Sequence, residues 1–182
     1  AVYRASWNGS RETMSREDLF LSIQLLIEDG DTGAALERLA YYQERYGFEP
    51  GVGILQSAVY ERQGKVNESL LAAFLELERA KNLGQLKRTG MVERVAEVKR
   101  KLAAPEWPLA ERGESCFIIL EAYMRDDFAA SLKGLERLDT DKDQSAYRYL
   151  LLASRLRTSR PTVGDIDDFI KLEPVFRAHP GY

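Results

Sequence analysis

Apolar residues recur at steps of three and four along most of this chain, a spacing that predicts amphipathic helices rather than strands. Turn residues divide these helices into pairs, so we expect helical hairpins at residues 15–47, 50–82, 113–138 and 144–173. A further helix is expected at 86–103, and residues 1–14 lack periodicity and form an irregular lead-in. The pattern predicts an all-α protein of about eight helices, with a single domain over residues 15–182.

Local signals predict where several helices begin. Ser15 followed by Asp18 matches an N-cap pattern in which the serine side chain accepts a backbone hydrogen bond. Pro50 is expected to open the third helix, because its fixed φ suits the first turn. Asp143 and Asp165 are expected to cap two helices near the C-terminal end.

The first three hairpins share a repeat register. Gly30 and Gly64, which end the first helix of two hairpins, are 34 residues apart, and so are the small residues Ala35 and Ser69. In the third unit Asp126 takes the place of the turn glycine, but it follows Gly64 by 62 residues rather than by a multiple of the period. The sequence therefore predicts a helical repeat that is interrupted before its third unit.

The second unit carries a small residue, a tyrosine, the turn glycine and another small residue at Ser57, Tyr60, Gly64 and Ser69. Small side chains let the helices of a hairpin approach closely, and the tyrosine fills the gap beside them. In these positions the chain resembles the tetratricopeptide repeat family, over residues 16–82 and more weakly over 113–138. The resemblance implies a right-handed superhelix of antiparallel hairpins, with a closely related α-solenoid as the alternative.

The resemblance also implies a partner-binding surface on the concave face, which the first helix of each hairpin builds. Carried over position by position, that face contains Phe20, Gln24 and Ile27 in the first unit, Ile54, Ala58 and Glu61 in the second, and Leu120, Tyr123 and Met124 in the third. Family members that hold a peptide's terminal carboxylate have a basic and amide clamp on this face, where this chain has Phe20, Gln24 and Ile54. We therefore expect a mixed apolar groove that binds a helix or an extended peptide.

A basic segment forms a second candidate contact. Between Lys81 and Lys101 there are seven basic and two acidic residues, a local net charge of +5. One hypothesis is that Lys87, Arg88 and Arg94 contact an acidic protein segment, a phosphate group or an anionic lipid surface. The alternative is a solvated helix face whose basic end suits the helix dipole.

Composition and charge narrow the function classes. The chain is 45% apolar and 30% charged, which is typical of a folded globular protein. Its net charge of −3 gives no general attraction to nucleic acid, so no nucleic-acid partner is expected. No apolar run reaches the roughly 18 residues of a membrane span.

Few residues carry metal or nucleophile chemistry. Cys116 and His179 are the sole cysteine and histidine, so an internal disulfide and a cysteine zinc site are excluded. Cys116 lies among apolar residues and is expected to be a buried hydrophobe. Asp139–Asp143 has the oxygen spacing that begins a calcium loop, but Gln144 and Leu150 stand where glycine and glutamate are needed. We therefore expect a polar turn, no metal, no cofactor and no enzyme activity.

The main hypothesis is a non-catalytic protein–protein interaction scaffold that binds a partner polypeptide through its concave groove. The alternative is a small-molecule or lipid-binding accessory protein of an envelope or transport system. A cytoplasmic location and a bacterial periplasmic or envelope location after processing both fit the sequence. Self-association through the terminal repeat is a further possibility, and the chain could also be a piece of a longer protein.

Overall fold

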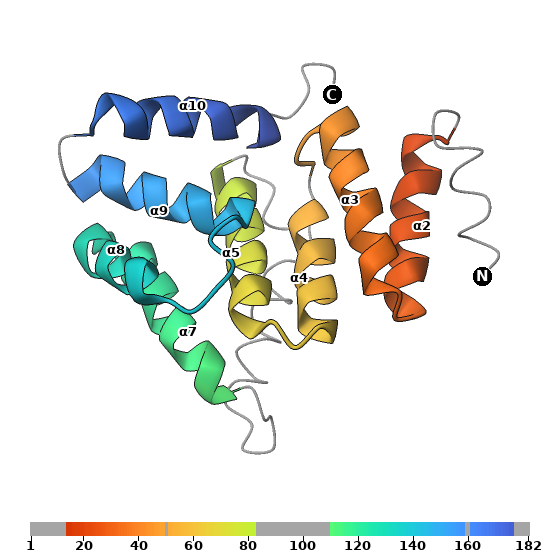
Figure 1. Ribbon diagram of the computed structural model, residues 1–182, viewed down its shortest axis with the longest axis horizontal. Coiled ribbons are helices and arrows are strands. Elements are labelled where there is room, and N and C mark those ends of the chain that lie inside the picture. Colours follow the sequence, from red (N-terminus) through yellow and green to blue (C-terminus); the bar gives the residue numbers. More distant parts are fainter. Residues whose placement is uncertain (1–13, 50, 83–109, 159–160, 177–182) are drawn as a thin grey trace.

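The computed structural model describes residues 14–49, 51–82, 110–158 and 161–176, and these residues form helices joined by short turns. The helices are α2 (Arg16–Glu28), α3 (Thr32–Tyr46), α4 (Val52–Arg62), α5 (Val66–Asn82), α7 (Ala110–Met124), α8 (Phe128–Arg137), α9 (Ser145–Thr158) and α10 (Val163–Phe176) (Figure 1). The all-α fold of helical hairpins is confirmed for this part of the chain. The helix expected at 86–103 lies outside the described residues, as do residues 1–13 of the lead-in.

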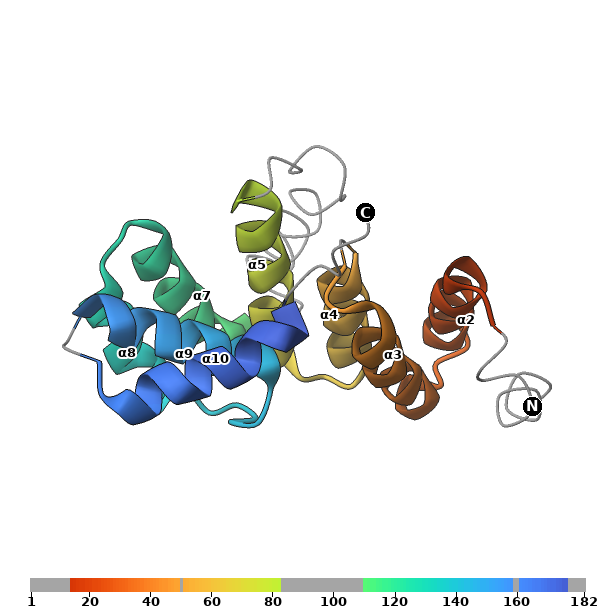
Figure 2. The same ribbon diagram turned by 90° about the horizontal axis from the view of Figure 1, so that it is seen from above.

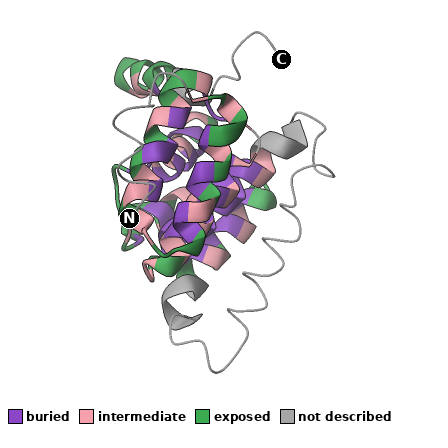
Figure 3. Cartoon of the chain, turned by 90° about the vertical axis from the view of Figure 1, so that its right-hand side faces the viewer, coloured by how far each residue is buried: buried purple, intermediate pink, exposed green. Residues whose placement is uncertain are grey.

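Consecutive helices pack against each other along the chain, from α2 with α3 through to α9 with α10. Helices α2, α3 and α4 occupy one side of the molecule, and α7 to α10 occupy the other, with α5 between them (Figures 1 and 2). Buried apolar residues from all of these helices form one cluster. Figure 3 shows buried residues along the inner sides of the helices and exposed residues outside.

The first three hairpins turn in the same way, which confirms the predicted register. The second residue after the first helix has a positive φ of 80°, 71° and 61° at Gly30, Gly64 and Asp126. The next N–H then reaches back five residues, in the bonds Asp31 N to Leu26 O, Lys65 N to Tyr60 O and Asp127 N to Ala122 O. This pair of features is the Schellman motif, and it starts the second helix at once.

The small residues of the register are buried between the paired helices. Ala35, Ser69 and Ser131 hold equivalent places in the second helix of each hairpin, and all three are buried. Ser69 forms a hydrogen bond of 2.9 Å with the hydroxyl of Ser57 across the second hairpin. The close approach of the helices that was inferred from small side chains is therefore present.

The predicted N-cap at Ser15 is confirmed, because its hydroxyl accepts the Asp18 N–H at 3.1 Å. The prediction that Asp165 caps the last helix is wrong, because α10 begins earlier. Thr162 Oγ1 accepts the Asp165 N–H at 3.1 Å, and the Asp165 carboxylate accepts the Thr162 N–H at 3.0 Å. Thr162 is the cap, and Asp165 completes a reciprocal capping box three residues later.

Helix α9 starts at Ser145, as the sequence predicts, but its expected cap is displaced by one residue. The carbonyl of Gln144 accepts the first helical bond, from Arg148 N at 3.0 Å, so Gln144 rather than Asp143 precedes the helix. The Asp143 N–H instead donates to the Asp141 side chain at 3.0 Å. This local turn provides a hydrogen-bond acceptor for the Asp143 N–H before the helix begins.

Helix α4 starts two residues later than expected and takes its cap from another helix. Gly51, not Pro50, is at the N-cap position, and it has no side chain to offer. The buried carboxylate of Glu76 in α5 accepts the N–H groups of Gly51 and Gly53 at 2.7 and 2.8 Å. A Cβ at Gly53 would lie 2.6 Å from the Glu76 Cβ, so glycine is required there.

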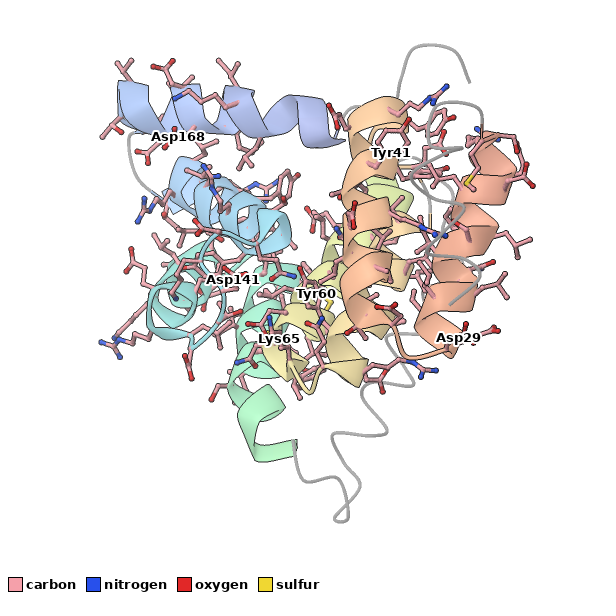
Figure 4. The ribbon with its side chains drawn as sticks, turned by 45° about the vertical axis from the view of Figure 1, so that its right-hand side comes forward. Asp29, Tyr41, Tyr60, Lys65, Asp141 and Asp168 are labelled. Atoms are coloured by element: carbon pink, nitrogen blue, oxygen red, sulfur yellow. The ribbon has the colours of Figure 1, made fainter. Side chains whose placement is uncertain are left out.

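The acidic turn between α8 and α9 docks on the start of α5. Asn67 Nδ2 donates to the Asp139 carbonyl at 2.7 Å, and the Asp141 N–H donates to Glu68 Oε1 at 2.9 Å. Figure 4 shows Asp141 close to Tyr60 and Lys65 of the second hairpin. The turn that resembled the start of a calcium loop therefore joins two hairpins.

Candidate binding site

Side chains from four helices line an open pocket of about 350 Å³ beside Tyr123. Its apolar walls come from Phe74 and Leu77 of α5, Tyr123 and Met124 of α7, and Phe128 of α8. Its polar lining comes from Glu78, Asp126 and Arg157. The pocket thus lies where the third hairpin meets α5 and α9.

Tyr123 is the central residue of the aromatic lining, because its ring contacts aromatic rings from two other helices. The Phe74 and Phe128 rings lie edge-on to it, with centroids 5.6 and 5.2 Å away. The Arg157 guanidinium carbon lies 4.7 Å from the centre of the Phe128 ring and 5.5 Å from that of Tyr123. Edge-on rings and a guanidinium over a ring face are both favourable arrangements.

The Tyr123 hydroxyl joins the two charged side chains of the pocket. It donates to Glu78 Oε1 at 3.2 Å and accepts a hydrogen bond from Arg157 Nη1 at 2.6 Å. One phenol thereby links α5, α7 and α9. Each of the three side chains restricts the orientation of the other two.

Burial raises the pKa of the Tyr123 phenol, and the nearby Glu78 carboxylate raises it further. Arg157 acts in the opposite direction but more weakly. The phenol therefore stays protonated at neutral pH, which the bond that it donates to Glu78 requires.

The edge of the pocket remains accessible. Met124 is 48% exposed, and Asp126 is exposed in the turn that follows it. The pocket therefore combines a fixed aromatic interior with a flexible apolar side chain at its opening.

The structure places two of the sequence-predicted contact residues, Tyr123 and Met124, in this pocket, and it buries Leu120 in the core. Phe20 and Gln24 lie on α2, and Ile54 and Glu61 lie on α4, on the other side of α5. All four keep some exposed surface. Phe20 also packs edge-on against Tyr42, with centroids 5.7 Å apart.

The expectation that Ile27 lines the partner surface is wrong. Ile27 is 7% exposed and belongs to the hydrophobic core. It lies one helical turn after Ile23, which is also buried, so both residues are on the inner face of α2. Lys87, Arg88 and Arg94 lie outside the described residues, and their contact with a partner stays a prediction.

Sequence reasoning missed Phe74, Glu78 and Arg157. The pair of aromatic residues that flank the third turn, Tyr123 and Phe128, was a signal that the sequence offered. No sequence signal identifies Arg157, because it reaches the pocket from a helix 34 positions further along the chain.

A second, polar pocket of about 370 Å³ lies beside the docked acidic turn, between residues 63–68 and 139–141. Within the described residues, no group of three or more histidine, cysteine, aspartate or glutamate side chains is arranged to hold a metal ion. In the same part of the chain, no helix is both long and apolar enough to cross a membrane.

Cys116 lies fully buried on α7 as a free thiol, which confirms the expectation of a small buried hydrophobe. Comparison with known proteins gave no match to a family model, a curated protein or a solved structure.

Proposed function

We propose that this chain is a non-catalytic interaction module, in which tetratricopeptide-like helical hairpins bind a segment of a partner polypeptide. The observation that carries the proposal is the aromatic pocket, whose Tyr123 is held by Glu78 and Arg157 while Met124 at its edge stays half exposed. Fixed walls lose little conformational freedom on binding, and a methionine adapts to the shape of its occupant.

The residue types in the pocket favour a polypeptide partner. Aromatic residues, methionine and arginine are enriched at protein interfaces, and the residues that contribute most to affinity gather in desolvated pockets. Here three aromatic side chains surround a pocket that also contains Met124 and Arg157. We expect the pocket to hold an apolar or aromatic anchor side chain of the partner.

The surface of α2 and α4 extends the proposed contact. Phe20, Gln24, Ile54 and Glu61 stay in the proposal because each keeps exposed surface. The basic segment 81–101 stays in it as a source of electrostatic selection for an acidic partner.

A small molecule or lipid is the second candidate occupant. The pocket volume of about 350 Å³ falls within the range typical of small-molecule sites. In that case the pocket would serve a ligand-binding accessory protein rather than a scaffold.

A matched pair of substitutions on α7 tests the proposal. Met124→Glu places a charge at the pocket edge, and Ile118→Glu places one on the same helix outside the pocket, where Ile118 is 59% exposed. Peptides enriched by the wild-type protein from a random phage-displayed library are titrated against all three proteins by calorimetry. We expect Met124→Glu to weaken binding by about tenfold or more and Ile118→Glu to leave it nearly unchanged.

Equal affinity of the enriched peptides for both variants and the wild type would remove the pocket from the proposal. The same protein preparations are extracted and examined by mass spectrometry. A stoichiometric small molecule that is recovered from the wild type and Ile118→Glu, but not from Met124→Glu, would favour the ligand candidate. The triple variant Lys87→Glu/Arg88→Glu/Arg94→Glu separately tests the basic segment against acidic peptides.

A further inference from the structure

Helix α10 exposes a ridge of apolar side chains on its outer face. Val163, Ile166 and Ile170 are 76%, 42% and 57% exposed. Their spacing of three and then four residues places them on one side of the helix. We call these three residues the outer ridge.

The outer ridge is not the face by which α10 packs on its own molecule. The opposite side of α10 meets α9, where the Phe169 ring lies 5.7 Å from that of Tyr149 and Asp165 Oδ1 lies 3.6 Å from Arg155 Nη1. Leu172 is buried on that side. Figures 1 and 2 show α10 at the outer edge of the described helices. The helix therefore has one face bound to the molecule and an apolar face directed away from it.

Charged side chains of both signs lie beside the outer ridge. Asp167 and Lys171 are exposed and one helical turn apart, so they share one flank of the ridge. Lys171 Nζ lies 3.3 Å from Asp168 Oδ1, and this pair is exposed to solvent. Figure 4 places Asp168 on the same helix. Because exposed ion pairs contribute little, Lys171 can exchange its carboxylate partner at small cost.

We propose that the outer ridge pairs, antiparallel, with the outer ridge of a second copy of this chain. A twofold axis near residue 169 places Asp167 opposite Lys171 of the second copy, and Lys171 opposite its Asp167. The same axis brings Ile166 beside Ile170 of the second copy, and Ile170 beside its Ile166. The flanking charges are thus self-complementary in this register. In a parallel pair the twofold axis runs along the helices, so this flank of one copy lies on the opposite side of the interface from the same flank of the other, and the charges do not meet.

The packing within the molecule supports a helix as the occupant. Each described helix packs on a neighbouring helix along the chain, so contact between helices is the packing that this molecule already uses. An antiparallel α10 from a second copy extends this arrangement across a symmetric interface. One helix from each copy buries less area than a standard interface, so the association is weak and depends on concentration.

Sedimentation equilibrium of the full chain over a concentration series, up to about 1 mM, tests this pairing. We expect the mass to rise from one chain toward two. Ile166→Asp/Ile170→Asp should raise the dissociation constant by at least about tenfold. Leu21→Asp is the matched control, because Leu21 is an exposed apolar residue of α2, at the far end of the molecule, and its change should leave the constant unaltered.

Charge reversal tests the antiparallel register. Asp167→Lys alone and Lys171→Asp alone bring like charges together and should weaken the dimer, whereas the double variant should restore it. Circular dichroism shows that each variant is folded. A wild-type chain that stays monomeric over the whole series, a dimer that tolerates Ile166→Asp/Ile170→Asp, or a double reversal that fails to restore association would each overturn the proposal.

Discussion

The environment of Cys116 shows how burial changes the chemistry of a residue. Its sulfur is fully buried on α7, where it lies 3.9 Å from the Asn67 carbonyl oxygen of α5. Burial raises the pKa of the thiol above its ordinary value of about 9, and the Glu68 carboxylate raises it further. The thiol therefore stays protonated in the folded protein, and the thiolate chemistry of cysteine is suppressed.

The raised pKa of Cys116 makes folding depend on pH. In the unfolded chain the thiol loses its proton above pH 9, while in the folded protein it keeps it. The unfolded state is thus favoured increasingly above pH 9, so this contribution to stability is complete below pH 9 and is lost as pH rises toward the folded-state pKa. We expect the free energy of unfolding, measured by urea titration, to fall between pH 9 and 10.

The variant Cys116→Ala provides the control for this prediction. It should be less stable at pH 7, because a buried side chain becomes smaller, but it should lose less stability between pH 9 and 10. The interval stops at pH 10 because Tyr42, Tyr60 and Tyr123 also have raised pKa values and affect stability above it. An identical pH dependence in variant and wild type would refute the assignment to Cys116.

At the scale of the helices, one turn geometry recurs three times, with glycine at its key position in two turns and aspartate in the third. Gly30 and Gly64 adopt the left-handed conformation without steric cost, whereas Asp126 adopts it as the one non-glycine residue of the described chain with a positive φ. The hydrogen bonds of the Schellman motif are nevertheless the same in all three turns. Aspartate is among the few residues that tolerate this conformation.

Asp126→Gly should therefore stabilise the protein, and Gly64→Ala should destabilise it. Removing the strained Cβ at Asp126 is expected to gain up to about 1 kcal/mol, and adding one at Gly64 to cost about 1–2 kcal/mol. Thermal unfolding monitored by circular dichroism measures both changes. If Asp126→Gly were the less stable of the pair, the left-handed turn could not be the dominant effect at these positions.

The start of α4 shows what an element's own sequence leaves open. Gly51 provides no side-chain cap, and the acceptor for its N–H is Glu76, 25 residues later in α5. Sequence patterns for helix caps require Ser, Thr, Asp or Asn immediately before a helix, so they cannot detect a cap that another helix provides. The displaced caps of α9 and α10 have a simpler cause, because neighbouring polar residues compete for the same cap position.

At the scale of the whole molecule, the docked acidic turn connects hairpins that are distant in sequence. Glu68 accepts the Asp141 N–H with its side chain and accepts a bond from Gln144 Nε2 with its carbonyl, at 2.9 Å in both cases. Asn67 donates to the Asp139 carbonyl. Helix α5 consequently contacts both α7 and α9, so the packing extends beyond neighbours along the chain.

Asn67→Ala should loosen this connection. The Asp139 carbonyl would lose its donor, and we expect a loss of about 1 kcal/mol in the free energy of unfolding. Hydrogen exchange at the amides of residues 139–144 should become faster. Lys133→Ala, a change at an exposed position of α8 that lines neither pocket, is the control and should alter neither measurement. Unchanged exchange in Asn67→Ala would show that the turn is held by its other bonds.

The sequence by itself determined the all-α hairpin fold of the described residues, the places of the helices and the register of the first three turns. These features depend on contacts within a few residues, where apolar spacing and turn residues act directly. The resemblance to the tetratricopeptide repeat family also included Tyr123 among the expected contact residues, by carrying its concave face over to the third unit.

Only the tertiary structure decided which residues share a site. Glu78 and Arg157 meet at the Tyr123 hydroxyl from helices far apart in sequence, and Ile27 is buried by the way that α2 packs. Helical periodicity tells which residues share a face, but not which face meets another helix, because that depends on how all the helices pack together. The aromatic pocket and the outer ridge follow from that packing.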